Sequence, residues 1–110
     1  MIAITDHNSA RNARVVAKLG GEKGLAVLPG MEVQTREEIH LLTLFPGWDS
    51  LTPWEEAVSR HLPGVKNDPE VFGDQPVVDG EGNILEFEER LLINSLDLSL
   101  EEVIGKVEAG

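Results

Sequence analysis

The chain has 110 residues, of which 41% are hydrophobic and 26% charged, and it contains no cysteine. This is the composition of an ordinary globular domain, and it excludes disordered and collagen-like chains, disulfide frameworks and zinc sites with cysteine ligands. No apolar run reaches the length of a membrane helix, which is about 20 residues. The chain also begins without the basic segment of a signal peptide, so we expect a cytoplasmic protein.

The net charge of −11 is unevenly distributed along the chain. Residues 1–40 carry five basic and five acidic side chains, whereas residues 41–110 carry four and fifteen. Because affinity for nucleic acid depends on lysine and arginine neutralising phosphates, this balance argues against nucleic-acid binding by the chain. We interpret the excess as a solvated acidic surface, and a surface that attracts cations is the alternative.

The first 45 residues predict the α/β class. Their elements are, in chain order, a buried-type strand at 2–5, a helix capped by Asn8 or Ser9 and stopped at Gly20-Gly21, a strand at 25–33 that Pro29-Gly30 interrupts, and a strand at 39–45. Continuous apolar runs are typical of parallel strands that are buried on both faces. Strand, helix, strand and strand in this order favour an α/β arrangement.

The pattern changes after Phe45. The predicted elements are a helix at 52–62 opened by the capping box Thr52–Glu55, an extended linker at 64–76, a hairpin of 77–79 and 84–87, and a helix at 99–109 opened by a second capping box at Ser99. We expect Trp48 and Trp54 to pack this part against the core. The chain thus divides into core strands and first helix (1–45), an acidic insertion (46–98) and a return helix (99–110).

The two ends of this pattern are abrupt. A buried-type strand begins at residue 2, and no strand follows the last helix. Such an arrangement leaves open sheet edges, which soluble proteins normally avoid. We therefore expect the chain to be an interior segment of a larger domain.

Three side chains beside the apolar strands have metal-binding chemistry, namely His7, Glu32 and His40. Functional groups gather at the carboxyl ends of parallel strands, and two histidines with one carboxylate suit zinc, manganese or iron. A carboxylate such as Asp6 can accept the second ring proton of a histidine and fix its tautomer. On residue types alone, structural histidines in satisfied surroundings are the alternative.

Other motifs have plainer interpretations. The residues Asp79–Asn83 are expected to form a hairpin turn, because the following positions do not fit a calcium loop. His61 is interpreted as a surface or partly packed residue of the predicted 52–62 helix. The basic side chains Arg11, Arg14 and Lys18 are interpreted as a solvated helix face, with phosphate recognition as the alternative.

Three sequence blocks together resemble the polymerase-and-histidinol-phosphatase (PHP) superfamily of metal-dependent phosphoesterases. They occur in the family's order with comparable gaps, and they are Ile4–Ser9 (ITDHNS), Leu28–Val33 (LPGMEV) and Ile39–Leu42 (IHLL). The resemblance covers residues 2–45, and residues 46–98 are similar to an insertion that some bacterial members carry.

This resemblance implies a partial, distorted (βα)7 TIM-like barrel of PHP type with an inserted helix and hairpin. It also implies that His7, Glu32 and His40 bind a divalent metal (zinc, manganese or iron, with magnesium as a further candidate), and that Asp6 belongs to the same motif. The family's chemistry is hydrolysis of phosphoesters by metal-activated water.

The chain departs from the family in lacking most of its ligands. The His-x-His block that precedes "TDH" in the family, and the later histidine and Asp-x-His block, have no counterpart here. We therefore predict a truncated phosphoesterase segment, and the sequence does not decide whether this segment is itself an active enzyme. In the complete domain, the predicted substrate is a phosphorylated small molecule or nucleotide. We expect no membrane partner. The alternative is a non-catalytic α/β fragment without a functional metal centre, which forms homo-oligomers through its open sheet edges.

Overall fold

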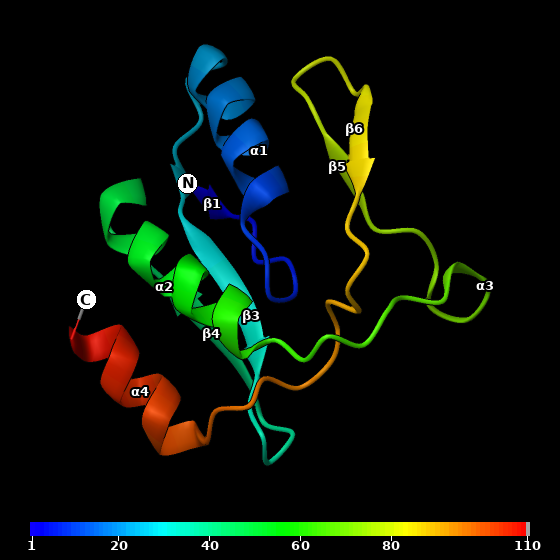
Figure 1. Cartoon of the computed structure of the whole chain (residues 1–110). Coiled ribbons are helices and arrows are strands. Elements are labelled where there is room, and N and C mark those ends of the chain that lie inside the picture. The colour runs from blue at the N-terminus through cyan, green and yellow to red at the C-terminus, as the bar shows by residue number, and fades with distance from the viewer. Residues whose placement is uncertain (110) are drawn as a thin grey trace.

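The computed structural model describes residues 1–109, and for Ala109 the backbone alone. These residues form four helices and three two-stranded sheets. Figure 1 shows how they are arranged. In chain order the elements are β1 (Ile2–Ala3), α1 (Arg11–Glu22), β2 (Val27–Leu28), β3 (Gly30–Gln34), β4 (His40–Leu44), α2 (Trp48–His61), α3 (Pro69–Phe72), β5 (Pro76–Val78), β6 (Ile84–Phe87) and α4 (Leu100–Ala109).

Strands β1 and β2 and helix α1 form a βαβ unit, in the predicted order of strand, helix and strand. Strands β1 and β2 pair in parallel, with Ile2 opposite Val27. The parallel alignment continues beyond β1, because residues His7 and Glu32 form an isolated parallel bridge. The segment after β1 therefore runs along β3, and α1 is the crossover that parallel pairing requires.

Strands β3 and β4 are antiparallel, from Gly30 opposite Leu44 to Gln34 opposite His40. The prediction of parallel-type strands, made from the apolar runs, is therefore wrong for β3 and β4. The physical reason is the short connection 35–39, since a parallel return needs a crossover of about a dozen residues or more. In the part of the chain described, the sheets do not close on themselves, and a (βα)7 barrel stays a prediction.

One face of the β3–β4 pair carries the core. Alternation along β3 turns Met31 and Val33 inward, and both are fully buried. Helices α2 and α4 cover this face and contribute Leu51, Trp54 and Val103 to the same cluster. In Figure 1, α2 lies along the β3–β4 ribbon. The opposite face, which carries Glu32, remains open.

Both long helices differ from their predicted bounds. Helix α1 continues through Gly20 and Gly21, and the chain turns at Gly24, whose φ of 75° glycine adopts without steric cost. Helix α2 begins at Trp48, so that Pro53 lies inside it and Thr52 is not its cap. The earlier start buries Leu51, and the Thr52 hydroxyl donates to the Trp48 carbonyl instead of capping the helix.

Three smaller predictions can be compared directly. The linker at 64–76 contains the short helix α3, because Asp68 accepts a hydrogen bond from the Glu70 N–H and caps it. The hairpin is confirmed as β5 and β6, and its turn is held by Asp79. Helix α4 is confirmed with Ser99 accepting from the Glu102 N–H.

None of the helices in the described residues is both long enough and apolar enough to span a lipid bilayer.

Candidate metal centre

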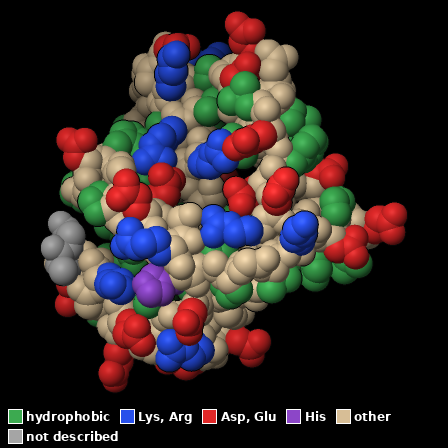
Figure 2. All heavy atoms as spheres, in the orientation of Figure 1, with side chains coloured by type: hydrophobic (Ala, Val, Ile, Leu, Met, Phe, Trp, Pro, Cys, Tyr) green, Lys and Arg blue, Asp and Glu red, His purple; other side chains and the backbone are tan. Residues whose placement is uncertain are grey.

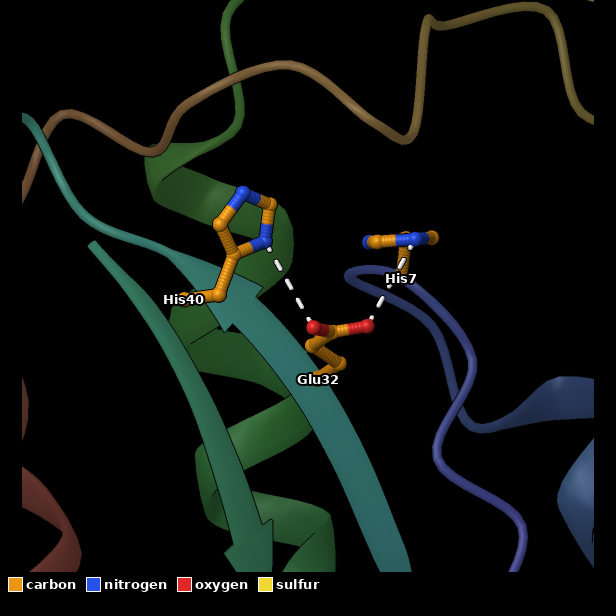
Figure 3. A group of neighbouring side chains, drawn as sticks. All are labelled: His7, Glu32 and His40. Carbon is orange, nitrogen blue, oxygen red and sulfur yellow. Dashed lines mark ion pairs between the residues drawn. The ribbon is translucent and has the colours of Figure 1, made fainter. Parts of the chain in front are cut away.

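His7, Glu32 and His40 lie together at one end of the β3–β4 pair (Figure 3). The Glu32 carboxylate stands between the two rings. Its Oε2 lies 3.5 Å from His7 Nε2, and its Oε1 lies 3.5 Å from His40 Nδ1. The two imidazole rings are 6.2 Å apart between centroids and nearly perpendicular, at 74°. Three separate segments of the chain thus supply three potential ligands.

Glu32 is placed by the alternation of β3. It lies between the buried residues Met31 and Val33, so its side chain points to the opposite, open face of the sheet. Packing of these two neighbours fixes the strand, and the carboxylate remains partly in solvent with 25% of its side chain exposed. Glu32 is therefore held rigidly without being desolvated as a core residue would be.

His7 is placed by backbone pairing with Glu32 itself. The Glu32 N–H donates to the Asp6 carbonyl at 3.0 Å, and the Asn8 N–H donates to the Glu32 carbonyl at 2.8 Å. This pair of hydrogen bonds sets the parallel bridge and holds the His7 ring beside the carboxylate. The residue is 40% exposed at its side chain, so one side of the ring faces solvent.

His40 opens β4 after the turn that reverses the chain. Buried Thr35 organises that turn, since its N–H donates to the Ile39 carbonyl at 2.9 Å and its hydroxyl accepts from the Ile39 N–H. The antiparallel register then places His40 opposite Gln34, on the same face as Glu32. From this position at the end of the strand pair, the His40 side chain reaches the Glu32 carboxylate.

The two imidazole nitrogens and the carboxylate fit a divalent metal that prefers nitrogen and oxygen ligands. Two ligands about 2.1 Å from a tetrahedral zinc ion are about 3.4 Å apart, close to the two 3.5 Å separations of nitrogen and oxygen. One ligand atom from each residue lies within 4.8 Å of the others. Two imidazoles and one carboxylate are ligands that iron, zinc and manganese accept, with further coordination positions left for solvent.

The same contacts have a second chemical interpretation. If the rings are protonated, each 3.5 Å separation is an ion pair of a histidine with Glu32. A metal and two ring protons exclude each other at these nitrogens, because coordination needs neutral imidazole.

Asp6 enters the site through its backbone. Its carbonyl accepts the Glu32 N–H, whereas none of the hydrogen bonds described for residues 1–109 joins its carboxylate to the His7 ring. Loss of water around the carboxyl raises the pKa of Asp6, and attraction to His7 opposes that rise, although the residue as a whole remains exposed. The predicted role in orienting a histidine ring stays a prediction.

The remaining sequence candidates lie elsewhere. His61 ends α2 and is partly buried, and its carbonyl accepts from the Asp97 N–H. Arg11 pairs with Glu86, and Arg14 makes two hydrogen bonds of 2.8 Å to Glu55. Figure 2 shows basic side chains beside acidic ones across this face. The interpretation of a solvated helix face is thus modified to one of ion-paired arginines.

Asn8 is a residue of this site whose role the sequence did not reveal. The expected helix cap is not formed by it, because α1 starts at Arg11 and its N-cap is Ala10. The Asn8 side chain instead donates to the carbonyls of Leu92 and Asn94. The sequence placed Asn8 directly after His7. This position does not indicate that its side chain bonds to residues far away in the chain.

Comparison of the chain with family models, with curated proteins and with solved structures found no match.

Proposed function

We propose that His7, Glu32 and His40 bind one divalent metal ion and form part of a metal-dependent phosphoesterase centre. The observation that carries the proposal is the convergence of two imidazoles and one carboxylate from three separate segments. The order and spacing of the three sequence blocks support the same chemistry. A metal bound there supplies an electrophile for phosphoryl oxygens and lowers the pKa of bound water.

The residues of the chain contribute binding and orientation. Glu32 offers one carboxylate oxygen to each side of the site, and the rings of His7 and His40 face it from opposite sides. All three side chains are partly exposed, at 40%, 25% and 52%. Solvent or a phosphoester can therefore approach from the open face of the sheet. The substrate class is a phosphorylated small molecule or nucleotide, in a complete domain and a cytoplasmic setting.

Calorimetric titration of the purified chain with Zn²⁺ and Mn²⁺ tests the site. We expect about one metal per chain, and Glu32→Gln or His40→Ala should weaken affinity by about 10-fold or more, because each removes or alters a ligand. His61→Ala is the matched control and should bind like the original chain, since His61 lies outside the cluster. Equal affinity in all four proteins would contradict the assignment.

Hydrolysis of 4-nitrophenyl phosphate by the metal-loaded chain is a separate measurement. Metal binding with turnover that Glu32→Gln abolishes supports the full proposal. Metal binding without turnover supports a partial centre that needs the ligands missing from this chain.

A non-catalytic, self-associating fragment is the second candidate function. It is favoured by the apolar side chains next to the cluster, since Leu42 and Leu44 of β4 are 65% and 49% exposed on the open face. Absence of metal binding, combined with a sedimentation coefficient that rises with protein concentration, would support this candidate over the first.

A further inference from the structure

We propose that Asn8 couples the 91–98 segment to the candidate metal centre, so that this segment acts as a positioning element for His7. The inference rests on the proposed function. The inference adds the 91–98 segment to the site, and this segment is far in the sequence from all three candidate ligands.

Asn8 is held in an unusual state for a polar residue. It is 6% exposed, and its φ of 51° lies in the left-handed region, which few residues other than glycine adopt and in which asparagine is enriched among the exceptions. Its side-chain oxygen is buried without a hydrogen-bond partner among the described residues. Each of these features costs free energy, so the contacts that Asn8 makes must offset them.

Those contacts join two distant parts of the chain. The Asn8 side-chain amide donates to the Leu92 carbonyl at 2.7 Å and to the Asn94 carbonyl at 2.9 Å. Its backbone N–H donates to the Glu32 carbonyl at 2.8 Å. One residue thus connects Glu32, through the backbone next to His7, to a segment more than eighty positions away.

The 91–98 segment also contacts the other side of the site. The Leu96 N–H donates to the carbonyl of Gln34, which is the residue opposite His40, and Leu96 is buried in the core. The segment therefore contacts the loop that carries His7 and the strand end that faces His40.

This arrangement predicts reciprocal coupling. If order in the 91–98 segment favours the metal-binding position of His7, then a bound metal must favour order in that segment by the same factor. Substituting a residue that orients a metal ligand, without binding the metal itself, typically lowers metal affinity by about 10- to 100-fold. The coupling is therefore measurable from either end.

Hydrogen exchange of the unmodified chain tests the coupling without a substitution. Saturating Zn²⁺ should slow amide exchange in the 91–98 segment about 10-fold, with Leu96 as a reporter. Exchange in the β5–β6 hairpin should not change, because none of the hydrogen bonds described for residues 1–109 joins a hairpin residue to Asn8 or to the three ligands. Unchanged exchange in the 91–98 segment at full Zn²⁺ occupancy would overturn the inference.

Asn8→Gly tests the side chain separately from the backbone. Glycine adopts the same φ without strain but cannot donate to Leu92 and Asn94. We expect about 10-fold weaker Zn²⁺ binding and loss of the Zn²⁺-dependent protection of the 91–98 segment. Asn12→Ala is the matched control, because Asn12 also bridges distant backbone, to Pro76 and Val78, without touching Glu32.

The outcomes separate the two proposals. Wild-type affinity and protection in Asn8→Gly overturn the role of Asn8, while the metal centre itself stands. An equal loss of affinity in Asn12→Ala overturns it too, since general loosening would then explain the effect. A chain that binds no Zn²⁺ at all overturns the proposed function first and this inference with it.

Discussion

Glu37 connects the turn before His40 to the last helix. Its carboxylate oxygens accept the Leu100 N–H at 3.1 and 3.2 Å, which caps α4 from a position far away in the sequence. Hydrogen bonding from Leu100 holds the pKa of Glu37 below its ordinary value of 4.5. A negative charge at a helix N-terminus is also favoured by the helix dipole.

The lowered pKa of Glu37 predicts a pH dependence of stability. The contribution of the carboxylate is fully present above the pKa of the unfolded chain and is lost as the pH falls through the lower pKa of the folded chain. Glu37→Gln should therefore lower the melting temperature at pH 7, and the difference from the original chain should shrink towards zero at pH 3. Thermal unfolding followed by circular dichroism measures both.

Glu38→Gln is the control for this comparison, because the Glu38 carboxylate makes none of the hydrogen bonds described for residues 1–109. A difference that stays constant between pH 7 and pH 3 would contradict a charged cap.

At the scale of elements, α1 and α2 are joined through Glu55. Its Oε2 accepts the Ala10 N–H at 3.1 Å, so a residue of α2 caps α1, and both carboxylate oxygens accept from Arg14. The Arg14 guanidinium also lies 5.2 Å from the centre of a Trp48 ring. Of the two residues that the sequence led us to expect at this helix start, Ser9 accepts the Arg11 N–H at 3.3 Å, whereas Asn8 bonds elsewhere, and Glu55 adds the long-range contact to Ala10.

Glu55→Ala should destabilise the chain by about 1–2 kcal/mol, because it removes a helix cap and a two-oxygen contact with arginine. Arg14→Ala should cost less, about 0.5–1 kcal/mol, since the cap at Ala10 remains. Urea unfolding of both variants, with Glu56→Ala as a neutral exposed neighbour, provides the measurement. A larger loss in Arg14→Ala than in Glu55→Ala would show that the cap is unimportant.

At the scale of the whole molecule, the chain forms a slab of 39 × 36 × 18 Å. Helices cover one face of the β3–β4 pair, and the other face carries the metal-ligand candidates together with exposed Leu42. A slab with one covered face has its stability concentrated in one layer of side chains. The open face can hold polar chemistry because it contributes little to the core.

Two leucine substitutions test this division. Leu51→Ala should cost about 2–5 kcal/mol, because Leu51 is fully buried, and an unfolding free energy of about 5–15 kcal/mol leaves little margin. Leu42→Ala should stay within about 0.5 kcal/mol. Urea unfolding at two protein concentrations decides the matter. A large, concentration-dependent cost for Leu42→Ala would mean that a second copy covers the open face.

Elements with local sequence signals could be predicted before the fold was known. Continuous apolar runs predicted strands at 25–33 and 39–45, where β3 and β4 lie, the turn residues 80–83 predicted the β5–β6 hairpin, and Ser99 predicted the start of α4. These signals suffice because periodicity, turn chemistry and caps act between residues a few positions apart. They also identified His7, Glu32 and His40 as candidates, through the motif blocks that contain them.

How these parts meet could not be predicted, because it depends on contacts between segments far apart in the sequence. The antiparallel return of β4, the start of α2 at Trp48 and the cap that Glu55 provides for α1 all depend on packing between distant segments. So do the bonds from Asn8 to the 91–98 segment. No local pattern encodes such contacts, because their free energy comes from burial and hydrogen bonding that exist only once the chain has folded.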